Sequence, residues 1–339
     1  MPIDRQSNIA RLNPSNISSG LRRYGPHNHA PQNRDECTAK SGTLVVFQKF
    51  YVWQRPHGKD MSSKIASRNN IKVLGKGSRP MLFAHGFGCD QNMWRFVAPA
   101  FTDDYKTVLF DYVGCGKSDM GAYDHDRYCN LNGYAQDLLD IIDALDLNDI
   151  IFVGHSVSSI IGILAAIRRP ERFANLILIG PSPRYINEPP DYAGGFDRAD
   201  IEGLLDMMDK NYIGWANFLA PVIMQNSEHP ELAGELEASF CSTDPVTARS
   251  FAQATFYSDN RADLEKVTTP ALILQCSDDA IAPFEVGEYV HKMLPGSALR
   301  IMRATGHCPH MSHPEETIAL IREYLAGHPM DLKLPAATL

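Results

Sequence analysis

The segment GHSVS, residues 154–158, nearly matches the Gly-x-Ser-x-Gly turn on which hydrolytic enzymes expose a nucleophilic serine. Gly154 fits the first glycine and Ser156 fits the nucleophile, whereas Ser158 stands where the pattern has its second glycine. Serine is nearly as small as glycine, and its hydroxyl can cap the helix that follows the turn. We therefore predict that Ser156 is a nucleophile and that Ser158 and Ser159 are structural residues.

A serine nucleophile needs a base and a carboxylate that orients the base, and the chain offers both. Asp279 and His307 each follow a short apolar run. The order Ser, Asp, His differs from the orders found in chymotrypsin and subtilisin. The sequence therefore predicts a Ser156–His307–Asp279 triad. Asp278 is the rival carboxylate, but adjacent residues at a strand end point in opposite directions, so only one of the two faces the histidine.

The segment HGFG, residues 85–88, follows the apolar run PMLFA. In hydrolases with this order of catalytic residues, the oxyanion loop lies at this place in the fold. We expect the backbone N–H groups of Phe87 and Val157 to stabilise the negative oxygen that forms when the serine attacks a carbonyl.

Six short apolar runs provide strands that would position these residues. Each run is apolar on both alternating faces, as strands buried in a parallel sheet must be. Amphipathic helical patterns separate the runs, so the sequence predicts a doubly wound, mostly parallel α/β sheet. The runs are PMLFAHG (80–86), TVLFDYVG (107–114), DIIFVGH (149–155), LILIG (176–180), ALILQC (271–276) and LRIMRATGH (299–307).

About ninety residues between LILIG and ALILQC interrupt this alternation with helical patterns alone. An insertion on the carboxyl side of a strand lies where such sheets bind ligands, and we interpret it as a helical lid. We expect residues 61–183 and 270–330 to form the core and residues 184–269 to form the cap.

The first 60 residues have a different composition, rich in Asn, Ser, Pro and Arg, with nine Lys and Arg against four Asp and Glu. Such a segment without apolar periodicity is typical of disorder, and we predict a disordered extension. LVVFQKFYVW (44–53) is an isolated strand-like run. The absence of acidic residues between Arg5 and Arg34 is faintly similar to a transit peptide, and Met61 is an alternative start of the protein.

The overall composition excludes several classes of function. The net charge of −8 argues against nucleic acid or an anionic membrane as a partner. A run of about 18 apolar residues, which a membrane span requires, does not occur, and neither does the apolar region of a signal peptide. Seven cysteines without C-x-x-C spacing indicate reduced thiols in a cytoplasmic protein.

Two competing motifs are weaker than the triad. GCGKS (114–118) resembles the end of a phosphate-binding loop, but the first glycine of that motif would fall on Asp111. HCPHMSH (307–313) contains three histidines, yet a metal on His307 would remove the base from the triad. We therefore predict neither a metal nor a cofactor. His310 and His313 are expected to be loop or helix-cap residues.

Longer segments resemble the RsbQ-like α/β-hydrolases, which include a bacterial stress-response regulator and the plant strigolactone and karrikin receptors. The resemblance implies the same triad and oxyanion hole, and a four-helix cap over a deep apolar pocket. It provides no counterpart for residues 1–60. The segments are HGFGCDQNMW (85–94), VLFDYVGCGKSD (108–119), GHSVSSIIGILAAIRRPERF (154–173), GPSPRYIN (180–187), ILQCSDDAIAP (273–283) and GHCPHMSHP (306–314).

The aromatic residues of the insertion either line a ligand pocket or pack the lid. Our predicted pocket residues are Phe87, Phe196, Trp215, Phe218 and Phe256. Few charges accompany them, so we expect a small apolar substrate with an ester or lactone carbonyl.

These features predict a serine hydrolase of a small hydrophobic ester or butenolide-like enol-lactone that works through an acyl-enzyme. The alternative is a ligand-sensing receptor or stress-response regulator, with slow or single-turnover hydrolysis and a signalling protein partner at the cap. A different reaction at the same site, such as perhydrolysis or cleavage of a C–C bond, is a third possibility.

Overall fold

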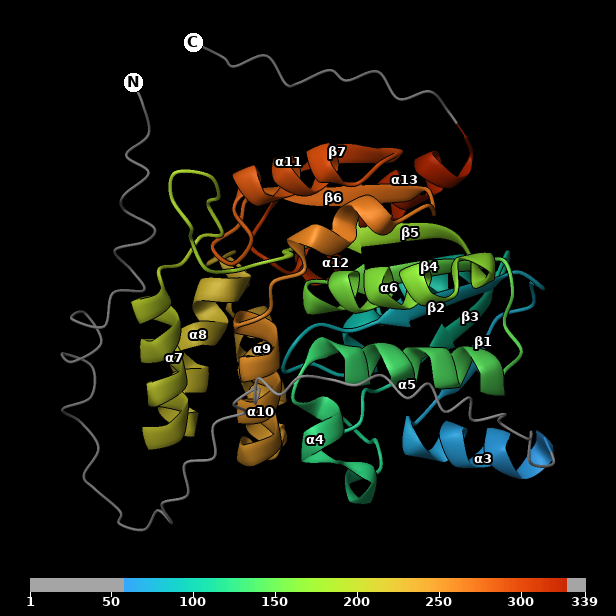
Figure 1. The fold of residues 1–339 in the computed structure, drawn as a ribbon, viewed down its shortest axis with the longest axis horizontal. Coiled ribbons are helices and arrows are strands. Elements are labelled where there is room, and N and C mark those ends of the chain that lie inside the picture. Colours follow the sequence, from blue (N-terminus) through green and yellow to red (C-terminus); the bar gives the residue numbers. More distant parts are fainter. Residues whose placement is uncertain (1–57, 328–339) are drawn as a thin grey trace, which may run out of the picture.

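The fold is built on a seven-stranded sheet with the order β1-β3-β2-β4-β5-β6-β7, seen in a computed structural model that describes residues 58–327 (Figure 1). β1 runs antiparallel to β3, and all other neighbouring strands are parallel. The predicted doubly wound, mostly parallel sheet is confirmed. The strands are β1 (Lys72–Leu74), β2 (Pro80–Ala84), β3 (Lys106–Leu109), β4 (Ile150–His155), β5 (Phe173–Ile179), β6 (Ala271–Asp278) and β7 (Ser297–Thr305).

Helices cover both faces of the sheet, as the uninterrupted apolar runs of its inner strands require. In β4, Phe152 belongs to a buried cluster with residues of α5 and α6, whereas Val153 belongs to a cluster with Trp94 and a residue of α13. The helices outside the insertion are α3 (Gly58–Arg68), α4 (His125–Tyr128), α5 (Leu131–Ala144), α6 (Val157–Arg168), α11 (Phe284–Met293), α12 (Pro309–Ser312) and α13 (Pro314–Leu325).

Four further helices lie between β5 and β6, and we refer to them as the cap. They are α7 (Arg198–Lys210), α8 (Tyr212–Met224), α9 (Pro230–Ser242) and α10 (Pro245–Phe256). Figure 1 shows them grouped beyond one end of the sheet, apart from the helices that flank its faces. They have a buried apolar cluster largely of their own. All four fall within residues 184–269, and the division of the chain at these boundaries stays a prediction.

Two elements at the start of the described chain were not predicted. β1 has only three residues, all exposed, so it lacks the apolar run that identifies the inner strands. α3 begins at Gly58, inside the predicted extension 1–60, and Met61 lies within this helix. Its last residue, Arg68, forms ion pairs with Asp137 and Asp140 of α5. These pairs tie α3 to the core.

The remaining predictions for the N-terminal segment, including the isolated run at 44–53, lie outside the described residues. Within residues 58–327, each helix is too short or too polar to cross a lipid bilayer.

Candidate active site

Ser156 lies at the sharp turn between β4 and α6. Its φ of 57° is a conformation that residues with side chains rarely adopt, so the turn holds the serine under backbone strain. Its N–H donates to the carbonyl of Ile179 at 2.8 Å, which fixes the turn to the neighbouring strand β5. A glycine at 154 permits the close packing inside the turn, because an added Cβ would lie 2.8 Å from the carbonyl oxygen of Ser158.

His307 and Asp279 meet Ser156 at the carboxyl end of the sheet. His307 Nε2 lies 2.7 Å from Ser156 Oγ, and His307 Nδ1 lies 2.8 Å from Asp279 Oδ2. A carboxylate only accepts hydrogen bonds, so Nδ1 carries the proton and Nε2 is left to accept from the serine hydroxyl. All three residues are buried, with Ser156 exposed by 6%.

The second oxygen of Asp279 fixes the carboxylate itself. Oδ1 accepts the N–H groups of Ile281 at 2.8 Å and Ala282 at 3.0 Å. Asp278, the rival carboxylate in the sequence, is exposed and pairs with Thr305 in the sheet. The two adjacent acids thus have opposite surroundings, and the structure brings Asp279 to the histidine.

The backbone of His307 is held from two sides. Its N–H donates to the carbonyl of Ile223 in α8 at 2.8 Å, and its carbonyl accepts a hydrogen bond from His155 Nε2 at 2.7 Å. Burial, with contributions from the nearby His310 and His307, lowers the pKa of His155 well below its usual range. His155 therefore stays neutral and donates through Nε2. His307 is thus positioned by the cap and by His155, the residue that precedes Ser156.

The loop that carries Phe87 is a tight turn closed by a hydrogen bond from Cys89 N–H to the Gly86 carbonyl at 3.3 Å. Gly88 has a φ of 68°, and a Cβ at this position would lie 2.1 Å from the ring of Phe240. Glycine is required here both for the conformation and for the approach of the cap. Ser239 of α9 donates to the Gly88 carbonyl at 2.8 Å, which links this loop to the cap.

Val157 is the first residue of α6 and is buried beside the nucleophile. The expectation that the Ser158 hydroxyl caps α6 is wrong. Ser158 Oγ instead donates to the carbonyl of His85, in the loop that carries Phe87. Ser159 Oγ donates to the carbonyl of Gly154 at 2.9 Å, within the turn itself.

Aromatic rings surround Phe87 on the side of the cap. Its ring centroid lies 6.2 Å from that of Trp215, 5.6 Å from Phe251 and 5.9 Å from Phe256. Phe240 adds a fourth ring at 6.1 Å. Of the predicted pocket residues, Phe196, Trp215 and Phe256 are buried in the apolar cluster of the cap, and Phe87 and Phe218 are partly buried against it.

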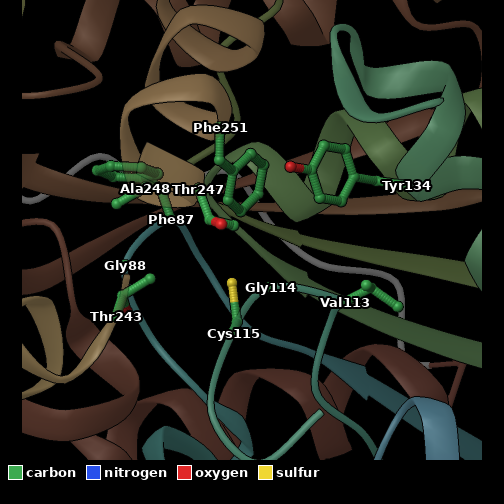
Figure 2. Close-up of a pocket in the computed structure, with 10 residues that line it drawn as sticks. All are labelled: Phe87, Gly88, Val113, Gly114, Cys115, Tyr134, Thr243, Thr247, Ala248 and Phe251. Atoms are coloured by element: carbon green, nitrogen blue, oxygen red, sulfur yellow. The ribbon is translucent and has the colours of Figure 1, made fainter. Parts of the chain in front are cut away.

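A narrow crevice lies beside Phe87, and its side chains leave no room for a water molecule. Figure 2 shows Cys115 pointing toward Phe251 and Thr247 across this space, with Tyr134 at one end. Ligand pockets usually have volumes of about 300–1,000 Å³, so this crevice is closed to a ligand unless its side chains move. A wider hollow of about 770 Å³ lies between the end of α8, the start of α9 and the segment 278–280.

His310 was expected in a loop or at a helix cap, but its side chain is fully buried in α12. Its ring packs against Trp94 at 4.6 Å and His155 at 4.4 Å, and neither of its nitrogens has a hydrogen-bond partner. Burial lowers its pKa to about 3. His313 lies at the boundary of α12 and α13. In the part of the chain that the structure describes, His, Cys, Asp and Glu form no group of three suited to a metal ion.

Asp111, which replaces a glycine of the phosphate-binding motif, ties the GCGKS turn together. Its carboxylate accepts the N–H of Lys117 at 2.9 Å and that of Gln91 at 2.8 Å. Asp111 therefore stabilises the GCGKS turn through hydrogen bonds to backbone N–H groups.

Three buried residues near the site were missed from the sequence. Phe240 belongs to the ring cluster around Phe87. Tyr112 bonds with Ser158. Burial raises the pKa of the Tyr185 phenol to about 12, and the neighbouring Ser156 side chain opposes this rise. Tyr112 and Tyr185 follow strands β3 and β5, and this position in the sequence could have identified them as residues near the site. The contact of Phe240 with Phe87 depends on tertiary packing and has no such signal in the sequence.

A model of the Alpha/beta hydrolase family matches residues 81–320. The chain belongs to the alpha/beta hydrolase family. The solved structure of a hydrolase from Oleispira antarctica is similar to this chain, with 47% sequence identity and a TM-score of 0.77. The match covers 79% of this chain and 98% of that chain.

Two plant proteins are similar to this chain over nearly their whole length. A karrikin insensitive 2 receptor of Petunia hybrida is 36% identical over 262 residues, 77% of this chain and 97% of the relative. A strigolactone esterase of Pisum sativum is 38% identical over 255 residues, 75% of this chain and 95% of the relative. The resemblance to the plant receptor group is confirmed.

Proposed function

We propose that this hydrolase cleaves a small hydrophobic ester or a butenolide-like enol-lactone, with Ser156 as the nucleophile. The observation that carries the proposal is the continuous chain of hydrogen bonds from Ser156 Oγ through His307 to Asp279. Such a chain makes a serine hydroxyl reactive near neutral pH, because the imidazole accepts its proton as the new bond forms.

The reaction follows from these positions. Ser156 Oγ attacks the carbonyl carbon and its proton passes to His307 Nε2, while the N–H groups of Phe87 and Val157 stabilise the negative carbonyl oxygen. Asp279 stabilises the imidazolium. His307 then donates the proton to the leaving alkoxide or enolate, which leaves an acyl-enzyme. A water molecule, deprotonated by the same histidine, releases the acid and regenerates Ser156.

The surroundings of Ser156 support a small apolar substrate. The ring cluster around Phe87 supplies apolar contact on the cap side, and a short acyl or ring substituent would enter the adjacent crevice when its apolar side chains move apart. We propose Phe87, Phe196, Trp215, Phe218 and Phe256 as pocket residues and residues 184–269 as the cap domain that carries most of them.

The second candidate is a receptor that hydrolyses its ligand slowly and signals through a protein bound to the cap. The observation in its favour is that a relative with 36% identity is a karrikin insensitive 2 receptor. Both candidates use the same catalytic residues. The rate of turnover distinguishes them.

The test uses a fluorescent butenolide ester and a fluorophosphonate probe on the full chain. We expect the wild type to release fluorophore and to be labelled covalently, and Ser156→Ala to lose both activities. An enzyme turns over its substrate at about 1 s⁻¹ or faster. A burst of about one equivalent followed by a slow phase would indicate the receptor. Normal turnover by Ser156→Ala would refute the proposal.

A further inference from the structure

We propose that the Ser158 hydroxyl is a positioning group that holds the two halves of the oxyanion hole in register. The inference rests on the proposed function, because it assigns a role to a residue that touches neither the substrate nor the base. One half of the hole is the N–H of Val157 at the start of α6, and the other is the N–H of Phe87 in the loop after β2. Ser158 bridges these two segments.

The bridge is a direct hydrogen bond between residues adjacent to the two halves. Ser158 follows Val157 in the first turn of α6, and its Oγ bonds to the carbonyl of His85, two residues before Phe87. Tyr112 Oη lies 3.0 Å from the same Ser158 Oγ. Ser158, His85 and Tyr112 are each 0% exposed, so water does not compete for these bonds.

The protons of this network have one consistent arrangement. A carbonyl only accepts, so the Ser158 hydroxyl donates to His85, and Tyr112 must then donate to Ser158. Burial raises the pKa of Tyr112 and keeps it protonated as this donor. The backbone N–H of Tyr112 donates to His85 Nε2 at 3.2 Å, which leaves the proton of His85 on Nδ1, facing the Gly86 carbonyl at 2.9 Å.

The loop that carries Phe87 is thus anchored to α6 through Ser158 and to the segment after β3 through Tyr112. A glycine at 158, as in the common motif, would leave the His85 carbonyl and the Tyr112 hydroxyl without this partner in a buried site. An unsatisfied buried group favours local rearrangement to recover a hydrogen bond. Donors of an oxyanion hole act only when they are aimed at the developing negative charge, so such a rearrangement lowers catalysis more than it lowers substrate binding.

The matched control is Ser159→Ala. Ser159 is also 0% exposed and lies in the same helical turn, but its hydroxyl bonds within the turn to Gly154 and does not reach the loop of Phe87. Tyr112→Phe provides a second probe, because it removes one donor and keeps the ring that packs against His85 and Phe251.

The experiment measures kcat and KM for p-nitrophenyl acetate and the inhibition constant of phenylboronic acid, which forms a tetrahedral adduct on Ser156. We expect Ser158→Ala to lower kcat on the order of 10-fold with little change in KM. Boronate affinity should fall by a similar factor, because the adduct uses the same N–H groups. Tyr112→Phe should give a smaller loss of about 3-fold, and Ser159→Ala should stay near the wild type.

Wild-type kcat and boronate affinity in both Ser158→Ala and Tyr112→Phe would overturn the inference, as would equal losses in Ser158→Ala and Ser159→Ala. If Ser158→Ala does not fold, the kcat and boronate affinity of Tyr112→Phe decide alone. Failure of the proposed function has a different signature: Ser156→Ala then keeps turnover and labelling, whatever the Ser158 variants do.

Discussion

The two sides of the candidate active site are held by different kinds of force. On the side of the sheet, Ser156, His307 and Asp279 are joined by directed hydrogen bonds of 2.7 and 2.8 Å at the ends of buried strands. On the side of the cap, the rings around Phe87 pack through apolar contact at centroid separations near 6 Å. Hydrogen bonds fix atomic positions, whereas apolar packing fixes mainly volume. On the proposed function, reaction type and ligand range would therefore depend on separate parts of the chain.

Three polar contacts join these two sides. Ile223 of α8 accepts the N–H of His307, Ser239 of α9 donates to Gly88, and Arg95 forms a bidentate ion pair with Glu235 of α9 at 2.6 and 2.5 Å. The cap is therefore hydrogen-bonded both to the segment of His307 and to the loop that carries Phe87.

The largest losses of activity are expected from variants of the hydrogen-bonded residues on the side of the sheet. His307→Ala removes the base and should lower kcat on the order of 10⁴-fold, and Asp279→Asn should cost somewhat less, on the order of 10³-fold. Asp278→Asn is the matched control, because it changes the adjacent carboxylate, which is exposed. Steady-state kinetics on p-nitrophenyl acetate, with thermal unfolding to check folding, would measure these losses. Equal losses for the two Asn variants would contradict the assignment of Asp279.

A smaller effect is expected when only the cap side changes. Phe251 lines the crevice and packs on Phe87, and Phe251→Leu replaces its ring by a smaller side chain. The ratio of kcat/KM for a butyrate ester to that for an acetate ester should therefore rise about 10-fold. The kcat for the acetate should stay within about 2-fold of the wild type, because the hydrogen bonds of the triad are untouched. Phe96→Leu changes an exposed phenylalanine and should leave the ratio unaltered. An unchanged ratio in Phe251→Leu would show that the crevice does not select the acyl chain of the substrate.

The smallest expected effect concerns stability behind the triad. Buried His310 has its pKa lowered to about 3 and lies near His155, His307 and Arg95. Between about pH 6.5 and 3, the unfolded chain binds a proton at this residue and the native protein does not, so His310 makes stability fall as the pH is lowered through this window. The slope approaches about 1.4 kcal/mol per pH unit for one such group.

His310→Phe keeps a ring between Trp94 and His155 and removes two buried nitrogens without partners. We expect denaturant unfolding at pH 7 to show equal or higher stability, and a shallower loss of stability between pH 6 and pH 4.5 than in the wild type. Identical slopes for the two proteins would show that His310 does not set the acid sensitivity.

The sequence predicted the parts of this molecule that depend on local pattern. The six apolar runs became strands β2 to β7. The residues that follow three of them, Ser156, Asp279 and His307, meet because parallel strands end at one edge of the sheet. The hydrogen bond of Ser158 was missed because its partner, His85, is 73 residues away in the chain. β1 was missed because an exposed three-residue edge strand has no apolar signature. Phe240 and the burial of His310 depend on the docking of helices, which periodicity does not specify.

The positive φ of Ser156 sets folding and chemistry in opposition at one residue. Backbone strain of this kind costs on the order of 1–3 kcal/mol, and glycine adopts the same conformation without a steric penalty. Ser156→Gly would give a more stable protein that lacks the hydroxyl. Variants selected from random mutants for thermal stability alone would therefore tend to lose the serine. The proposed chemistry and the stability of the fold therefore have opposite requirements at this one position.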